Sequence, residues 1–223
     1  MAKGPSYRLP FRRRREGKTD YKARRAMIIS RVSRVVARGS LKHMNVQIVQ
    51  ATLKGDEVIA SANSQELHTY GWKAACGNLP SAYLTGLLCG RRAVEKKVKS
   101  AVADIGLRQA TKGARVFASI KGVLDAGVDV PHKADILPAE ERLKGQHIVE
   151  YAAVLASSNT ELYEKSFSEY LKAKLSPEKL EEHFTDTKKK IQASKEMEKG
   201  KVKRERLTKK SAQEKRRRKS GKK

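Results

Sequence analysis

The chain has 223 residues, 39% of them hydrophobic, so it can form one well-packed domain but cannot be core throughout. Its 50 Lys and Arg outnumber 24 Asp and Glu, and the resulting formal charge of +26 at pH 7 indicates a polyanionic partner. The composition favours nucleic acid over an anionic membrane surface, and the longest apolar stretch, near Leu79 to Cys89, is too short to span a bilayer.

The positive charge is concentrated at the two ends of the chain. Residues 1–25 contain 10 basic and 2 acidic side chains, and residues 188–223 contain 18 and 4. In residues 26–187 the positive and negative charges nearly balance, with 22 basic and 18 acidic side chains. The sequence therefore predicts a nearly neutral globule with two cationic arms. Because the first residues lack the apolar segment of a signal peptide, we expect a soluble intracellular protein.

The first arm contains four consecutive arginines after Phe11, within the segment 11–25. Adjacent guanidinium groups repel one another, and no acidic run nearby in the sequence can neutralise them. We predict that this arm binds nucleic-acid phosphates, with Tyr7, Phe11 or Tyr21 available to stack on exposed bases. A solubilising or targeting tail is one alternative. The charge does not distinguish RNA from DNA, so a DNA-compacting protein is another.

A helix and three strands are predicted next. Residues 21–30 form a short arginine-bearing helix that begins after Thr19 or Asp20, either of which can accept a hydrogen bond from a free amide. β-branched residues then alternate with polar ones, which predicts an antiparallel meander over residues 33–40, 43–53 and 56–64.

A long helix is predicted within residues 77–100, after one or two helical turns at 64–72. Pro80 suits its first turn because the amide hydrogen that proline lacks would have no partner there. Ala82, Gly86 and Gly90 follow at i, i+4 and i+8 and let another element approach closely. We expect that element to be the sheet.

The sequence from residue 101 onward predicts alternating strands and helices, followed by helices alone. Residues 101–107 and 115–120 are short apolar runs of strand length, which implies parallel pairing. Beyond about Ala193 too few large apolar residues remain to offset the entropy of ordering, so we expect disorder until RNA binds. Between these regions, amphipathic helices are predicted over residues 139–156, 160–175 and 177–192.

Catalytic and metal sites are only weakly indicated. Cys76 and Cys89 lack CxxC spacing and a nearby His, which argues against zinc and favours packed free thiols. Asp104 with Asp125 or Asp129 could supply the metal-binding carboxylates of a nuclease, and this alternative stays open. We expect no enzyme, and no cofactor beyond Mg²⁺ as an RNA counterion.

The only tryptophan, Trp72, allows two interpretations. It can stack on RNA from a loop, or it can cover the edge of the core. The basic tail gives a less specific signal, and we expect only non-specific backbone contacts from it.

Six motifs in a fixed order resemble one known family. Together they are similar to the universal large-subunit ribosomal protein that binds 5S ribosomal RNA, called protein eighteen in bacteria and archaea and protein five in eukaryotes. The resemblance covers residues 4–190. The motifs are FRRRREGKTDYKAR at 11–24, ASANSQELHTYGW at 60–72, LPSAYLTGLLCGRRA at 79–93, ADIGL at 103–107, VFASIKGVLDAGVDVPH at 116–132 and KGQHIVEYA at 144–152.

The resemblance implies a fold, a role and a set of partners. The fold is a three-layer α/β/α domain with a mixed five-stranded sheet, of ribonuclease H-like architecture. The role is to hold 5S rRNA against the large-subunit rRNA in the central protuberance of the cytoplasmic ribosome, beside neighbouring large-subunit ribosomal proteins. No membrane or small-molecule substrate is implied. The expected organisation is a basic RNA-binding arm at 1–25, a 5S rRNA-binding α/β core at 26–156, a helical C-terminal extension at 157–192 and a basic tail at 193–223.

The matching positions also imply which residues touch RNA. The segment 91–107 runs without the insertion of eukaryotic members, so the core is archaeal in type. The basic extension after Ile191 is longer than in many archaeal members. The expected RNA-binding residues are Tyr7, Arg8, Phe11, Arg12, Arg13, Arg14, Arg15, Lys18, Thr19, Tyr21, Arg24, Arg25, Trp72, Asn78, Tyr83, His132, Lys144 and His147.

Overall fold

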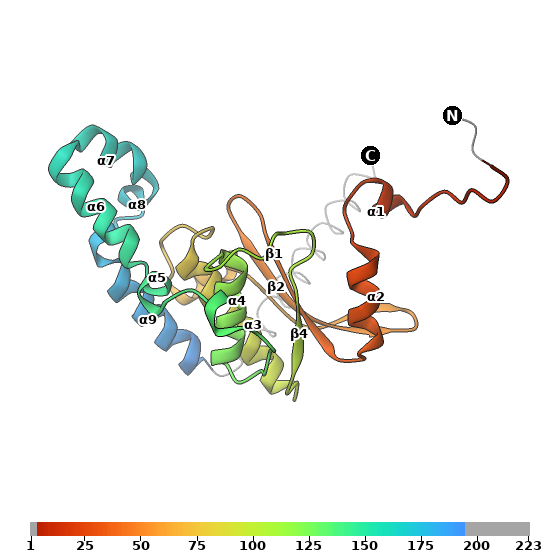
Figure 1. Ribbon diagram of the computed structural model, residues 1–223. Coiled ribbons are helices and arrows are strands. Elements are labelled where there is room, and N and C mark those ends of the chain that lie inside the picture. The colour runs from red at the N-terminus through yellow and green to blue at the C-terminus, as the bar shows by residue number, and fades with distance from the viewer. Residues whose placement is uncertain (1–3, 195–223) are drawn as a thin grey trace, which may run out of the picture. The chain divides into compact units, whose positions relative to one another are not determined.

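The computed structural model describes residues 4–194, which form an α/β fold around one mixed sheet (Figure 1). The order of strands across the sheet is β3-β2-β1-β4. β1, β2 and β3 pair antiparallel, which confirms the predicted meander, and β4 pairs parallel to β1. From residue 195 onward the predicted tail lies outside the described residues. The strands are β1 Ser33–Gly39, β2 Met44–Thr52, β3 Gly55–Asn63 and β4 Ala101–Asp104.

The sheet buries one face through the alternation seen in the sequence. In the register of β1 and β2, Val35 lies opposite Ile48 and Ala37 opposite Val46, and all four side chains are fully buried. Because alternate side chains of a strand point to opposite faces, these four form part of one apolar face.

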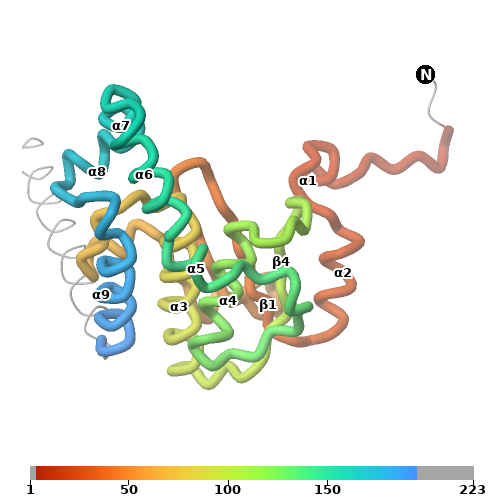
Figure 2. The backbone as a smooth tube through the Cα atoms, turned by 60° about the vertical axis from the view of Figure 1, so that its left-hand side comes forward, coloured from red at the N-terminus to blue at the C-terminus, as the bar shows by residue number. Residues whose placement is uncertain are grey.

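Two views show helices on both sides of the sheet (Figures 1 and 2). α3 and α4 lie on one side, and α2 lies on the other. None of the described helices is both long and apolar enough to cross a membrane. The elements up to α4 are α1 Arg12–Arg15, α2 Tyr21–Ile29, the 3-10 helix η1 Ser64–Tyr70, α3 Leu79–Glu95 and α4 Arg115–Asp125.

The long helix α3 is the centre of the core. Pro80 lies in its first turn, as predicted, and the Asn78 side chain caps it by accepting a hydrogen bond from the Ser81 amide at 2.9 Å. Thirteen of its 17 residues are buried, so it is covered on nearly every side. It ends at Glu95, earlier than the predicted range.

The prediction of a strand over residues 115–120 was wrong, because these residues begin α4. A short apolar run does not distinguish a strand from a buried helix, and here Val116, Ile120 and Val123 follow the helical repeat into the core.

The element packed against the glycines of α3 is therefore α4 and not the sheet. A Cβ atom at Gly86 would overlap the Ser119 carbonyl of α4, and one at Gly122 of α4 would overlap the Tyr83 carbonyl of α3. The two helices thus meet backbone to backbone, which only glycine permits at both positions.

The expected fifth strand is not formed by the described residues. In its place, a single parallel bridge joins Ser100 to Asp129 beside β4. Its hydrogen bonds run from the Ala101 amide to the Asp129 carbonyl and from the Asp129 amide to the Lys99 carbonyl, both at 2.9 Å. The sheet is mixed and four-stranded, and the ribonuclease H-like architecture stays a prediction.

The helical segments predicted after Pro138 are present but more divided. Gly145, at a φ of 90°, separates the first pair of helices, and Phe167 lies between the second pair. A side chain at Gly145 would collide with Leu180 at 2.9 Å, because the last helix crosses there. The elements are η2 Ala134–Ile136, α5 Glu140–Lys144, α6 Gln146–Ser158, α7 Thr160–Ser166, α8 Ser168–Lys172, η3 Pro177–Lys179 and α9 Leu180–Ala193.

The last helix closes the core rather than extending from it. Leu180, Phe184 and Ile191 of α9 are buried, and the Phe184 ring lies 5.6 Å from the Tyr83 ring of α3. The division into a core at 26–156 and an extension at 157–192 stays a prediction, since both segments contribute to the same hydrophobic cluster.

Replacing Gly86 by alanine should lower the free energy of unfolding by at least about 2 kcal/mol, because the added methyl group overlaps backbone that cannot rotate away. Urea denaturation followed by circular dichroism measures the change. The control is Gly4→Ala, whose added methyl group meets nothing within 4 Å and should change stability by less than about 0.5 kcal/mol. Equal stabilities for the two variants would contradict the close contact.

Candidate nucleic-acid interface

The four arginines of α1 form an exposed and poorly neutralised cationic surface. Among residues 4–194, Glu16 is the one acidic side chain that pairs with them: its carboxylate lies 3.3 Å from Arg12, and it also lies 2.9 Å from Lys18. Within the part of the chain that the structure describes, five other arginines of the arm form no ion pair. They are Arg8, Arg13, Arg14, Arg15 and Arg25.

The local sequence also fixes how the arm is held. The Nε of Arg13 donates a hydrogen bond to the Thr19 hydroxyl at 2.9 Å and closes the turn between α1 and α2. Asp20 then caps α2 by accepting hydrogen bonds from the amides of Lys22 and Ala23, which confirms the predicted start. α2 buries none of its residues, and its Lys22 and Arg25 are exposed to solvent.

Aromatic side chains lie among the arginines as predicted. Phe11 is 74% exposed, and its ring centroid lies 5.7 Å from that of Tyr21. Tyr7 is 47% exposed. An exposed aromatic face beside guanidinium groups is the combination that binds single-stranded RNA through stacking and charge.

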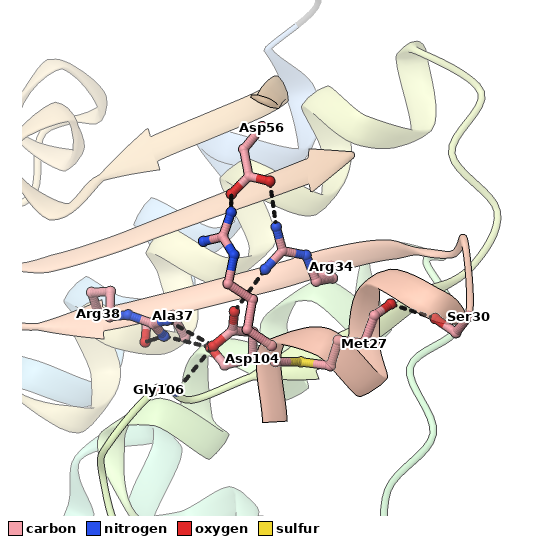
Figure 3. A network of polar contacts seen from close by, with 9 residues as sticks. Met27, Ser30, Arg34, Ala37, Arg38, Asp56, Asp104 and Gly106 are labelled. Atoms are coloured by element: carbon pink, nitrogen blue, oxygen red, sulfur yellow. Dashed lines mark hydrogen bonds and ion pairs between the residues drawn. The ribbon is translucent and has the colours of Figure 1, made fainter. Parts of the chain in front are cut away.

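A buried charge network connects this arm to the sheet (Figure 3). Arg34 of β1 is 2% exposed, and its guanidinium lies 3.2 Å from the Asp104 carboxylate of β4 and 2.9 Å from that of Asp56 in β3. Asp56 also pairs with Arg24 of α2 at 2.8 Å. Three strands and one arm helix are therefore joined by alternating charges.

Asp104 uses its acceptors within the fold. Its Oδ1 accepts from Arg38 at 2.7 Å and from the Gly106 amide at 3.0 Å, and its backbone carbonyl accepts from Arg38 at 2.6 Å (Figure 3). A carboxylate surrounded by two guanidinium groups and an amide is a structural anion.

This geometry does not support the nuclease alternative. Asp125 accepts a hydrogen bond from the Tyr83 hydroxyl at 2.8 Å and pairs with Lys121 at 2.9 Å, and Asp129 contributes its backbone to the bridge beside β4. Among residues 4–194 no group of three or more His, Cys, Asp or Glu could hold a metal ion.

Two of the expected RNA contacts, Trp72 and Tyr83, are buried in this structure, and their contact with RNA stays a prediction. Trp72 is 1% exposed, donates from Nε1 to the Ala75 carbonyl and stacks on His183 at 5.1 Å between ring centroids, which favours the core interpretation. Tyr83 is 2% exposed, and burial followed by the adjacent Asp125 raises the pKa of its hydroxyl. Both rings pack inside the fold.

The remaining expected contacts outside the arm lie in different environments. His132 is exposed, and Lys144 is half-buried and pairs with Glu181 at 3.6 Å. His147 is half-buried, and burial followed by the charge of Arg142 lowers its pKa. Asn78 caps α3 and donates to the Tyr170 hydroxyl at 3.3 Å, so it serves the fold.

Both cysteines are free and buried, as expected for packed thiols. Burial raises the pKa of Cys76, and it raises that of Cys89 to about 12. Neither thiol has the depressed pKa of a reactive cysteine.

Sequence reasoning missed a basic pocket at the far end of α2. Its cationic residues are Arg31, Lys96, Lys97 and Lys99. The run of lysines after the long helix was the available signal, but it was interpreted as part of a nearly neutral globule.

Comparison with known proteins gives a consistent result. The family model described as ribosomal large subunit proteins 60S L5 and 50S L18 matches residues 5–102 and 93–133. The chain is 49% identical over 191 residues to large ribosomal subunit protein uL18 of Methanothermobacter thermautotrophicus, covering 86% of this chain and 98% of that protein. It is 51% identical over the same length to large ribosomal subunit protein uL18 of Methanococcus maripaludis, with the same coverage.

Replacing Asp104 by asparagine should lower the free energy of unfolding by about 3 kcal/mol, because Arg34 and Arg38 lose a buried counter-charge. Asp135→Asn is the control: its carboxylate is exposed and 3.7 Å from Lys112, so its loss should cost less than about 0.5 kcal/mol. Chemical denaturation measures both. Magnesium-dependent RNA cleavage by the wild type that disappears in Asp104→Asn would instead restore the nuclease hypothesis.

Acidification should destabilise the contact between α9 and the Trp72 loop. Burial, followed by the charges of Lys190 and Lys73, lowers the pKa of His183, whose Nε2 accepts the Lys73 amide at 3.0 Å. As the pH falls below about 6.5, this histidine takes up a proton in the unfolded state before it does so in the folded state. The proton therefore stabilises the unfolded state relative to the folded state at these pH values. The Tm measured from about pH 7.5 to about pH 5 should therefore fall less in His183→Phe than in the wild type. Parallel pH profiles would refute this role.

Proposed function

Because this chain belongs to the family of ribosomal large subunit proteins 60S L5 and 50S L18, we propose that it binds 5S rRNA and attaches it to the large-subunit rRNA in the central protuberance. The chain is a structural constituent of the large subunit of the cytoplasmic ribosome and not an enzyme. Its archaeal-type core agrees with its archaeal relatives.

The observation that carries the proposal is the unneutralised charge of the arm. Arg14, Arg15 and Arg25 are exposed and form no ion pair within residues 4–194. The fold pairs its buried charges but leaves these exposed cations unpaired, so they repel one another. RNA phosphates would neutralise them and remove that repulsion. Guanidinium groups suit this role because they bind phosphate oxygens in a bidentate manner.

The core has a different task in this proposal. It holds the arm in position through the Arg24–Asp56 pair, which is anchored by the buried Arg34, while the arm supplies most of the RNA affinity. Mg²⁺ enters only as a counterion of the RNA, and no small-molecule substrate or membrane is involved. The neighbouring partners are large-subunit ribosomal proteins, and the fold is proposed to be ribonuclease H-like.

Removing two arm charges should weaken binding to 5S rRNA and flatten its dependence on salt. Each lost phosphate contact reduces the slope of log K against log salt by roughly 0.9, so Arg14→Gln/Arg15→Gln should reduce it by about 2. A binding titration against 5S rRNA over a salt series measures both quantities.

Two exposed cations elsewhere provide a matched control. Lys172→Gln/Lys179→Gln removes the same charge from the helical extension, where neither lysine forms an ion pair with a described residue. It should leave the slope unchanged. An unrelated folded RNA of equal length tests specificity, and equal affinity of the wild type for both RNAs would favour a general polycation such as a DNA-compacting protein.

A further inference from the structure

We propose that the basic pocket beside the first residues of β1 and β4 is a second RNA site, which binds the phosphodiester backbone of ribosomal RNA. The inference rests on the proposed ribosomal function and adds a surface separate from the arm. The pocket is open and has a volume of about 490 Å³. It is lined by residues 31–33 at the start of β1, by residues 96–100 between α3 and β4, and by one residue each of β2 and β3, Gln50 and Ile59. Its cationic side chains are Arg31, Lys96, Lys97 and Lys99.

Within residues 4–194, no acidic side chain forms an ion pair with the cations of this pocket. The described residues that line it include no Asp or Glu, and their polar members are serines and Gln50. Lys96 donates to the Ile59 carbonyl, whereas Arg31, Lys97 and Lys99 form no ion pair with any described residue. Cations that converge on a concave surface concentrate positive potential, which attracts a polyanion.

Backbone conformation provides an independent argument. Within residues 4–194, three residues other than glycine have positive φ: Arg31 at 56°, Lys97 at 62° and Lys174 at 54°. Two of these three line the same pocket. Residues other than glycine are disfavoured in this region, and such strain is often found at binding sites.

Lys97 occupies a position that usually belongs to glycine. α3 ends in a Schellman motif, with the Lys97 amide donating to the Val94 carbonyl at 2.8 Å and the Val98 amide to the Ala93 carbonyl at 3.0 Å. Glycine would form the same two hydrogen bonds without strain. At this position Lys97 adds a cation to the pocket lining that glycine would not supply.

The pocket and the arm can contact RNA together. α1 lies at one end of α2, and the chain turns into β1 at the other end, where Arg31 lines the pocket (Figure 1). α2 has 9 residues and is therefore about 13 Å long at roughly 1.5 Å per residue. That separation corresponds to about four nucleotides at roughly 3.4 Å each along one strand of a duplex.

The test removes the three unpaired cations and compares the result with a matched variant. The pocket variant is Arg31→Gly/Lys97→Gly/Lys99→Gln, in which glycine relieves the positive φ at the first two positions. The control is Lys172→Gln/Lys174→Gly/Lys179→Gln, which removes three exposed cations from α8, its C-terminal turn and η3. Both are titrated over a salt series against 5S rRNA and against the transcribed large-subunit rRNA.

The pocket variant should bind one of these RNAs at least about tenfold more weakly than the control, with a salt slope lower by about 2 to 3. If the pocket variant loses affinity for 5S rRNA, the pocket contacts that RNA. If it loses affinity only for the large-subunit rRNA, the pocket contacts the large-subunit rRNA. No difference from the control with either RNA would overturn the proposal. If the wild type itself does not distinguish 5S rRNA from an unrelated RNA of equal length, the proposed function fails instead.

A pair of single variants separates RNA binding from folding. Lys174 also ends a helix in a Schellman motif, with its amide donating to the Leu171 carbonyl and the Leu175 amide to the Tyr170 carbonyl, both at 3.0 Å. Lys97→Gly and Lys174→Gly should therefore shift Tm in the same direction and by similar amounts. Only Lys97→Gly should weaken RNA binding, and equal affinities for the two variants would contradict the role of Lys97.

Discussion

The contact between α3 and α4 is the constraint on which the rest of the fold depends. Gly86 and Gly122 let the two backbones touch, and this brings the Ser119 carbonyl against α3. With α4 this close, α3 is enclosed between the sheet and its partner helices, which explains why most of its residues are buried. The last helix, α9, packs against the first turns of α3, where the Phe184 ring contacts the Tyr83 ring. Packing of this density leaves no room inside for an RNA base.

The molecule separates its charges into two groups with different functions. Arg34 and Asp104 are buried and paired, and they fix the relation of β1 to β4. Most cations of α1 and of the pocket near Lys97 are exposed and form no ion pair with a described residue; Arg12, which pairs with Glu16, is the exception. Because buried pairs are little affected by salt whereas exposed cations are screened, the fold should tolerate salt concentrations that release RNA.

Much of this arrangement was predictable from local patterns, and the failures have physical causes. The meander and the Asn78 cap follow from alternation and capping chemistry, which are local. Residues 115–120 were misread because a short apolar run fits either a strand or a buried helix until its partner is known. Trp72 was ambiguous for a similar reason: its partner, His183, lies far away in the chain. The basic pocket joins four separate stretches of the chain, so no single window of sequence reveals it.

The pairing of Arg34 with Asp104 also bears on the order in which the chain can fold during its synthesis. The two residues are 70 positions apart, and β4 is the last strand to be made. Until it emerges, the meander has an open edge beside β1, and Arg34 has only Asp56 as a counter-charge. Closing so long a loop is entropically costly and slow compared with forming a hairpin. The nascent protein therefore exposes a cationic strand edge for as long as α3 is being translated.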